Sequence, residues 1–414
     1  MKLLKSQINM YKTISYIFIL FILIIVCIYI YIRMKYGFWF AQPVFHVYDI
    51  WYMFAPPGII QHELPRENKY TNFKNIETIS YKELSDIRLQ RFVHFINSNY
   101  LQNKDNIFCP KPENVEPYFV GHNDKSFVSF YTEKELVTNL KKGTIVEERR
   151  IVGTMTSRPI HVFINKGDKD SYFDAYYVDY LCVDKNYRKK GIAPQIIQTH
   201  NYNHRHLNKK IAVCLFKRED ELTGIVPLCV YSTYGFSMKK WHKPHELHDM
   251  YKLLEINHQN FHFLVDFMKS TAGQFDIIIN TEHSNIIELI NTKNMFVYVL
   301  MEHDSNNIKC AYFYRKTCVF YEKGLEILTC FASINGFDSV RNNHIFTQGF
   351  KITFWKTAEK NYFGFAVIEN ISHNNMIIEN LSIKTKPVVV SPTAYFFYNF
   401  AYHSFKPKKV LILN

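Results

Sequence analysis

A basic turn in the middle of the chain carries the residues best suited to binding a phosphate group. The turn reads Arg188-Lys189-Lys190-Gly191, and a helical pattern starts at Ile192. The first N–H groups of a helix have no intrahelical acceptor, so they can donate to an anion that binds at this end of the helix. Glycine allows a close approach of the backbone, and the flanking charges add attraction. The turn therefore predicts a diphosphate site, although the same residues could cap an ordinary helix.

The elements around this turn form a strand, helix, strand unit. Residues 173–183 read as a long strand, the helix starts near Ile192, and residues 211–216 read as a buried strand. Further strands are expected at 309–321, 325–333 and 394–413. Amphipathic helices are expected at 81–100 and 245–269, and a strand pair around Gly153 and Pro159 is expected within 150–164.

An apolar run near the amino terminus predicts a single membrane-spanning helix. Residues 14–32 contain no charge, and Lys12 and Arg33 flank the run. Nineteen residues of helix span about 28 Å, close to the ~30 Å hydrocarbon core of a bilayer. A cleaved signal peptide fits less well, because the run is long and is followed by Arg33 and Lys35 rather than by a small-residue cleavage site.

Composition indicates a globular protein without a disulfide framework. Of the 414 residues 47% are apolar and 21% are charged, and the eight cysteines form no CxxC pair. The net charge of +13 favours a polyanionic partner, but no zinc-finger spacing or basic-region helix accompanies it, so no nucleic acid is expected. No metal site is expected either. The best candidate ligands, His200, His204 and His206, read more simply as a helix end beside the basic turn.

The motif Arg188-x-x-Gly191-x-Ala193 resembles the acyl-CoA pyrophosphate signature of the GNAT acyltransferase superfamily. The surrounding block resembles one branch more closely, the N-myristoyltransferases. These enzymes carry a strand ending in Asn-Phe-Leu-Cys-Val, a basic turn and Leu/Val-Ala-Pro; residues 179–183 and 192–194 follow the same order.

Three further segments extend the resemblance towards both ends of the chain. The family's Phe-Trp-x-x-Gln-Pro-Val is present at 38–44, and its helix ending in Asn-Tyr-Val is matched at 99–101. Its final Lys-Val-Gly-Leu-Val-Leu type strand is similar to residues 409–414. The resemblance implies an α+β fold with two related GNAT-like halves, preceded here by the membrane helix. The implied organisation is an anchor at 1–35, an acyl-CoA-binding half at 36–235, and a second half at 236–414 that completes the peptide site.

The resemblance also implies roles for individual residues. The backbone amides of Tyr180 and Leu181 correspond to the oxyanion hole, and the terminal carboxylate of Asn414 corresponds to the general base. The cofactor-binding set implied is Phe38, Trp39, Cys182, Val183, Arg188, Lys189, Lys190, Gly191, Ile192 and Ala193.

The chain departs from the family pattern where the acceptor amine binds. Phe216 and Lys217 stand where the family has Tyr-Thr, and a shifted alignment would use Thr223 instead. Gly191 replaces the family's arginine in the phosphate turn and is nearer to the general GNAT form.

The implied activity is transfer of a long acyl chain, most simply from myristoyl-CoA, to the amino-terminal glycine of a peptide or protein. The implied location is a single-pass membrane protein with its large domain in the cytoplasm, where acyl-CoA is found and cysteines stay reduced. Two alternatives remain: a different GNAT enzyme that uses acetyl-CoA, favoured by Gly191, and a catalytically inactive membrane-bound interaction module, favoured by Lys217.

Overall fold

The computed structural model describes residues 2–101, 106–139, 144–165, 171–219, 224–322 and 324–414. The helices are α1 (Lys2–Tyr36), α2 (Ile50–Phe54), α3 (Asp86–Asn99), α4 (Pro112–Val115), α5 (Ile192–Leu207), α6 (Phe261–Thr271), α7 (His283–Asn291), α8 (Asn343–Asn361) and α9 (Asn374–Ser382). The strands are β1 (Gly58–Ile59), β2 (Ile76–Ser80), β3 (Asn106–Phe108), β4 (Phe127–Asn139), β5 (Thr144–Ile164), β6 (Ser171–Val183), β7 (Val213–Glu219), β8 (Cys229–Ser237), β9 (Tyr251–Glu255), β10 (Ile277–Asn280), β11 (Met295–Glu302), β12 (Ile308–Tyr321), β13 (Leu325–Asn335), β14 (Phe363–Glu369), β15 (Val389–Tyr398), β16 (Phe400–Ala401) and β17 (Val410–Leu413).

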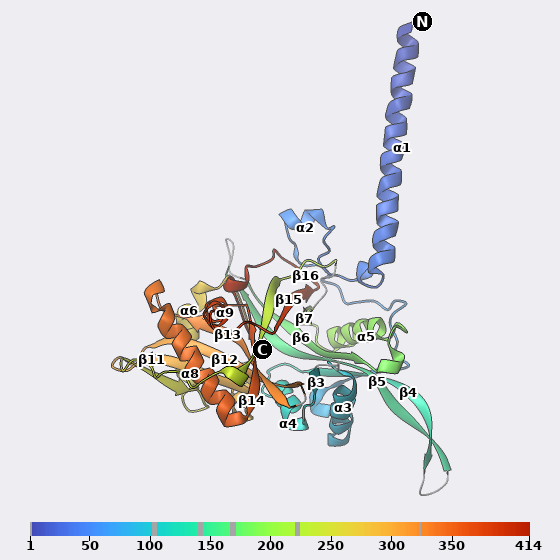
Figure 1. The fold of residues 1–414 in the computed structure, drawn as a ribbon. Coiled ribbons are helices and arrows are strands. Elements are labelled where there is room, and N and C mark those ends of the chain that lie inside the picture. Colours follow the sequence, from blue (N-terminus) through green and yellow to red (C-terminus); the bar gives the residue numbers. More distant parts are fainter. Residues whose placement is uncertain (1, 102–105, 140–143, 166–170, 220–223, 323) are drawn as a thin grey trace.

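One large mixed sheet organises the domain. Among the described residues it contains fifteen strands, and its main path runs β17-β10-β5-β6-β7-β15-β8-β14-β13-β12-β11-β9. Helices cover its faces, and α1 projects away from it as a single long rod (Figure 1). The predicted α+β class is confirmed.

Two parallel crossovers give the sheet its internal repetition. Strand β6 leads through α5 to β7, and β13 leads through α8 to β14; each pair of strands is parallel. A helix between two parallel strands is the usual βαβ connection. The β6–α5–β7 unit agrees with the prediction made around the basic turn.

Strands from late in the chain join the early ones. Strand β15 pairs with both β7 and β8, and β10 pairs with β5 on one side and β17 on the other. Strands from late in the chain therefore contribute to the region around β5, β6 and β7. The division at residue 235 falls within β8, and the two-domain boundaries stay a prediction.

The predicted strand pair at 150–164 is wrong, because these residues belong to one continuous 21-residue strand, β5. Strand β4 pairs with β5 as far as Ser157, and β10 pairs with it from His161 onward. Pro159 lies in the gap between these two partners, so its missing N–H breaks no ladder there. Gly153 is packed under Ile196 of α5, which explains a small residue without a turn.

The predicted helix at 245–269 is also wrong over its first half. Residues Tyr251–Glu255 form β9, which pairs with β11 at the edge of the sheet, and helix α6 begins only at Phe261. In the turn between the two elements, the Asn260 side-chain Oδ1 accepts a hydrogen bond from the Asn257 amide at 2.8 Å. Pairing with a distant strand overrides the local helical pattern.

Helix α1 contains a 27-residue stretch, Met10–Tyr36, that is long and apolar enough to cross a membrane. Its large apolar side chains are exposed, so they contribute nothing to the core of the domain. Its length and composition fit a single membrane span or a signal sequence.

Candidate active site

A cavity of about 510 Å³ opens where β6 and β7 stop pairing. The two parallel strands are in register only from Ala175 to Tyr177 on β6 and from Val213 to Leu215 on β7. Beyond these positions β6 stays with β5 and β7 stays with β15, so the strands diverge. The volume lies within the ~300–1,000 Å³ usual for small-molecule sites. The cavity is lined by Trp39, Tyr100, Leu101, Met155, Tyr177, Val178, Asp179, Tyr180, Leu181, Ile197, His200, Asn201, His204, Cys214, Phe216, Lys217, Arg218, Glu219 and Tyr398.

A β-bulge interrupts β6 at the wall of this cavity. Thr154 of β5 pairs with Cys182 and Thr156 pairs with Asp179, so Tyr180 and Leu181 together face the single residue Met155. Tyr180 has φ +48°, a left-handed conformation that is uncommon for a residue with a side chain. Bulges redirect backbone groups away from the strand ladder, and this one turns two residues of β6 towards the cavity.

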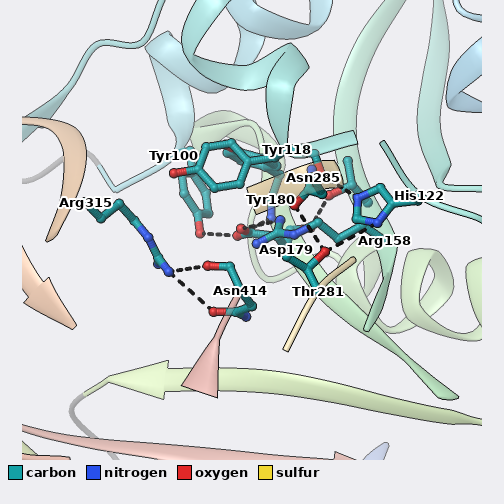
Figure 2. Close-up of polar contacts among 11 residues, drawn as sticks. Tyr100, Tyr118, His122, Arg158, Asp179, Tyr180, Thr281, Asn285, Arg315 and Asn414 are labelled. Atoms are coloured by element: carbon teal, nitrogen blue, oxygen red, sulfur yellow. Dashed lines mark hydrogen bonds and ion pairs between the residues drawn. The ribbon is translucent and has the colours of Figure 1, made fainter. Parts of the chain in front are cut away.

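The Asp179 carboxylate lies beside the Tyr180 amide, a backbone hydrogen-bond donor in this bulge. Its Oδ1 accepts a hydrogen bond from the Tyr180 amide at 2.8 Å and one from the Tyr100 hydroxyl at 3.1 Å (Figure 2). Its Oδ2 lies 3.5 Å from Nη1 of Arg158, whose side chain is buried. Burial, reinforced by Asp179, keeps the pKa of Tyr100 well above its ordinary value, so the hydroxyl remains a donor. A substrate oxygen that used the Tyr180 amide would have to replace this carboxylate.

The basic turn presents a row of backbone donors at the amino-terminal end of α5. Gly191 has φ +74° and Lys189 has φ +64°, and both conformations curve the chain tightly. The N–H groups of residues 188–193 donate no hydrogen bond within the described part of the chain. They precede a 16-residue helix whose dipole favours an anion at this end.

The side chains of the turn have different tasks. Arg188 donates from Nη2 to the carbonyl of Asn99 at 2.9 Å and from Nε to that of Val183 at 3.2 Å, so it ties the turn to the end of α3. Lys189 and Lys190 are exposed, and Nζ of Lys190 lies 4.5 Å from the ring centre of Tyr187. The exposed charge available to a ligand therefore comes mainly from the two lysines.

Aromatic residues after α1 cover the cavity. Trp39 lines it and stacks on Phe216 of β7, with ring centres 5.8 Å apart and planes 15° apart. Phe38 packs edge-on against Tyr70 at 5.0 Å. The Trp39 carbonyl is held by Nε2 of His46 at 2.8 Å. This segment therefore belongs to the cavity wall and is not simply a linker.

Helix α5 contributes two buried histidines to the lining of the cavity. His200 lies between the Ser129 and Ser157 hydroxyls at 2.8 and 2.9 Å, and burial lowers its pKa to about 3. Nε2 of His204 lies 3.6 Å from Sγ of Cys214, and burial lowers the His204 pKa well below its ordinary value. Nδ1 of His204 is buried without a hydrogen-bond partner in the structure described.

Lys217, the residue after Phe216 on β7, also lines the cavity and belongs to a buried ion pair. Nζ of Lys217 lies 3.1 Å from Oε1 of Glu369, and the Tyr231 hydroxyl donates to the other carboxylate oxygen. Burial lowers the pKa of Lys217, but Glu369 and Glu219 outweigh it and the net pKa is raised. Lys217 therefore keeps its positive charge, and the neighbouring Glu369 carboxylate balances that charge. Thr223, the alternative acceptor-binding residue, lies outside the described residues.

Asn414 is buried at the end of β17, 1% exposed. Nη2 of Arg315 donates to its main-chain oxygen and lies 3.4 Å from its side-chain Oδ1 (Figure 2). Asn414 does not line the cavity described above, whereas the predicted oxyanion donors Tyr180 and Leu181 do.

Comparison with known proteins locates this arrangement among known folds. No protein-family model matches the sequence, and no curated protein matches it in sequence. The crystal structure of Saccharomyces cerevisiae N-myristoyltransferase with bound myristoyl-CoA superposes with a TM-score of 0.67 at 12% identity, covering 90% of this chain and 94% of that one. A tandem GNAT protein from the clavulanic acid biosynthesis pathway gives a TM-score of 0.51 at 9% identity, covering 80% of this chain and all of the other.

The chain has an N-myristoyltransferase-like GNAT fold with two halves. The resemblance stated from sequence motifs is thereby confirmed at the level of fold.

Within this fold, most of the sequence-predicted residues lie in three places, and Asn414 lies apart from them at the end of β17. Tyr180, Leu181 and Trp39 border the cavity together with Phe216 and Lys217. The residues of the basic turn are not among those that line the cavity; they precede α5, which supplies Ile197, His200, Asn201 and His204 to its wall. Cys182 is buried behind the bulge, where burial raises its pKa to about 12, so it is an inert thiol.

Sequence reasoning assigned no role to four charged residues that contact the predicted site residues or one another. These are Arg158, Asp179, Arg315 and Glu369. Asp179 stands inside the strand motif, where the family has Asn, and that change from a neutral to an acidic side chain was an available signal. The other three lie in apolar strands, and nothing in their local pattern distinguishes them.

No group of three or more His, Cys, Asp or Glu side chains that could hold a metal ion occurs among the described residues. Of the three histidines considered, His206 turns away from the other two and its Nδ1 lies 2.7 Å from the Tyr202 carbonyl.

Proposed function

We propose that this chain is an acyl-CoA-dependent N-acyltransferase that moves a long acyl chain to an amine. The observations that carry the proposal are the cavity between the diverging ends of β6 and β7, the bulge at its wall, and the basic turn that opens α5, a helix that lines the cavity further along. The turn and the bulge meet the two needs of a nucleotide thioester, a diphosphate site and donors near the carbonyl.

The cofactor is assigned to this site as follows. The amides of residues 188–193, with Lys189 and Lys190, bind the diphosphate of CoA. The thioester lies at Tyr180 and Leu181, and Trp39 covers it. The acyl chain extends along α5 towards His200 and His204. The yeast enzyme of the same fold was crystallised with myristoyl-CoA, which favours a long chain over acetyl.

The acceptor is proposed to be the amino-terminal glycine of a peptide, entering from the Lys217 and Asn414 side. The neutral amine attacks the thioester carbonyl, a C–N bond forms, and the C–S bond breaks as CoA leaves as a thiolate. The α-carboxylate of Asn414 accepts the proton lost by the amine. Arg315 orients this carboxylate, although its positive charge also reduces the basicity of the group it holds.

The location proposed is a membrane, with α1 as a single span and the large domain in the cytoplasm. The eight cysteines are free, six of them buried, which suits a reducing compartment. A single acyl chain gives only marginal membrane binding, so an anchored enzyme would keep its products near their destination.

A second candidate is a binding module that keeps acyl-CoA or peptide affinity without turnover. It is favoured by the Asp179 carboxylate, which accepts the hydrogen bond of the Tyr180 amide and places negative charge where an oxyanion would develop. Such a module would bind acyl-CoA and never consume it.

The experiment that tests the proposal is thermal unfolding of the full-length protein with myristoyl-CoA, acetyl-CoA or CoA. A ligand at 100 times its Kd stabilises by about 2.7 kcal/mol. We expect the largest rise in Tm with myristoyl-CoA and a smaller rise with CoA. Equal shifts with acetyl-CoA and myristoyl-CoA would favour a short-chain GNAT enzyme. If no CoA compound shifts the Tm, the cavity does not bind this cofactor and the proposal is wrong.

A further inference from the structure

Helix α2 carries an exposed apolar surface that the cavity does not explain. Its sequence is Ile-Trp-Tyr-Met-Phe, without a charged side chain. Trp51 is 84% exposed, Phe54 78% and Ile50 63%. Removing apolar surface from water is favourable, and aromatic side chains grouped this way on a surface commonly mark a binding site.

The position of α2 is fixed relative to the end of α1. The ring of Tyr29, inside the apolar run of α1, packs edge-on against Phe40 at 5.4 Å. Phe40 in turn lies 6.3 Å from the ring of Tyr48, which shortly precedes α2. Tyr36, at the end of α1, packs closely against Gly224 of the domain. Figure 1 shows α2 standing out from the domain on the same side from which α1 projects.

These contacts set the depth of α2 relative to a membrane spanned by α1. Arg33 is the first charge after the apolar run and lies four residues beyond Tyr29, about 6 Å along the helix. Phe40 therefore lies beside the last apolar turn of α1, at the level of the membrane interface. Trp and Phe side chains are favoured there, and Arg33 and Lys35 are positioned to contact lipid phosphates.

We propose that α2 inserts into the interface of the bilayer that α1 spans, with Trp51 and Phe54 as the inserted side chains. The proposal rests on α1 being a membrane span and is independent of acyl transfer. Trp39 and Phe40 are neighbours on this segment, one at the cavity and one against α1. Insertion of α2 therefore brings the covered side of the cavity to the lipid surface.

The test uses full-length protein reconstituted into phosphatidylcholine vesicles with or without bromine on the acyl chains. Bromolipid quenches tryptophans that reach the bilayer. We expect quenching in the wild type, the same quenching in Trp241→Phe, and loss of most of it in Trp51→Phe. Phe54→Glu, which keeps Trp51 but charges the inserted face, should reduce the Trp51 component several-fold.

Three outcomes would overturn the proposal. Equal quenching of wild type and Trp51→Phe would show that Trp51 does not reach lipid. Trp51 accessible to aqueous iodide and unaffected by bromolipid would show a free surface. Trp51 shielded from iodide but not quenched by bromolipid would show that protein, such as a second copy of this chain, covers α2. Flotation with the vesicles reports insertion of α1 separately, so a floated protein that fails these tests contradicts the α2 proposal alone.

Discussion

Arg315 of β12 donates a hydrogen bond to the main-chain oxygen of Asn414, 99 residues away in sequence. The Arg315 guanidinium also lies over the ring of Phe331, with Cζ 4.4 Å from its centre, so its orientation is fixed from two sides. This pair joins Asn414 to β12, the strand beside the second crossover unit, and defines where the proposed base can lie.

If the α-carboxylate of Asn414 is the base, activity depends on the position of that carboxylate and not on the Asn414 side chain. Removing Asn414 moves the carboxylate by one strand residue, about 3.3 Å. We expect kcat to fall by about 10²–10⁴, the usual contribution of general acid–base catalysis. Asn414→Ala retains the carboxylate and is the matched control, for which we expect nearly full activity. Equal activity of all three proteins would exclude this base.

Substitution of Gly191 tests the proposed diphosphate site. Its φ is +74° and a Cβ added there meets no atom within 4 Å, so Gly191→Ala changes conformation rather than packing. A left-handed alanine costs about 1–2 kcal/mol, and we expect acyl-CoA affinity to fall by roughly 5- to 30-fold. Gly273→Ala, with equal space and an ordinary φ, should bind normally. Calorimetric titration with myristoyl-CoA measures both.

Asp179→Asn separates an enzyme from a binding module. The amide oxygen can still accept from the Tyr180 N–H, but the negative charge beside the developing oxyanion is removed. Like charges about 4 Å apart repel by roughly 1–4 kcal/mol from bulk water to a protein surface, and we expect kcat to rise about tenfold. Asp174→Asn, on the same strand, serves as the control. A fall in kcat would instead identify Asp179 as the base.

The lowered pKa of buried His200 predicts that the folded protein loses stability against unfolding in mild acid. Its folded pKa is about 3, below the ordinary value of 6.5, so the unfolded chain binds a proton that the folded chain does not. Stability is therefore fully present above pH 6.5 and declines as the pH falls towards 3. Between pH 7 and 5 the wild type should lose about 2 kcal/mol more than His200→Gln in denaturant unfolding. Parallel stability curves for the two proteins would contradict the assignment.

The Lys217–Glu369 pair predicts that the effects of substituting its two members on the free energy of unfolding are strongly non-additive. Lys217→Met leaves the Glu369 carboxylate, 6% exposed, without its cation. We expect a cost of about 3 kcal/mol, the low end for breaking a buried pair, because 20% of the Lys217 side chain is exposed. Adding Glu369→Gln should restore most of the stability. If both variants unfold at the same denaturant concentration, the pair is not coupled.

The local part of the site was predictable from sequence because its signals are local. The strand before the turn, Gly191 and the apolar stripe of α5 lie within about 35 residues, and their order is that of the structure. The polar partners of the site were not predictable, because Arg315 and Glu369 reach it through strand pairings with residues far away in sequence. Single-residue patterns cannot specify such pairings.

The same limit explains the errors in the fold. From the sequence, Pro159 is expected to separate two strands. In the structure it lies within β5, at a position where one edge of that strand has no partner. Residues 251–255 read as helix, yet pairing with β11 makes them a strand. In both cases a distant partner determines the local structure.

The most direct test of the central claim is turnover. Full-length protein is incubated with myristoyl-CoA and a peptide that begins with glycine, and free CoA thiol and peptide mass are followed together. We expect thiol release matched by one myristoyl group per modified peptide, with no reaction when the peptide's amino terminus is acetylated. Binding of myristoyl-CoA without thiol release or peptide modification would contradict an acyltransferase activity.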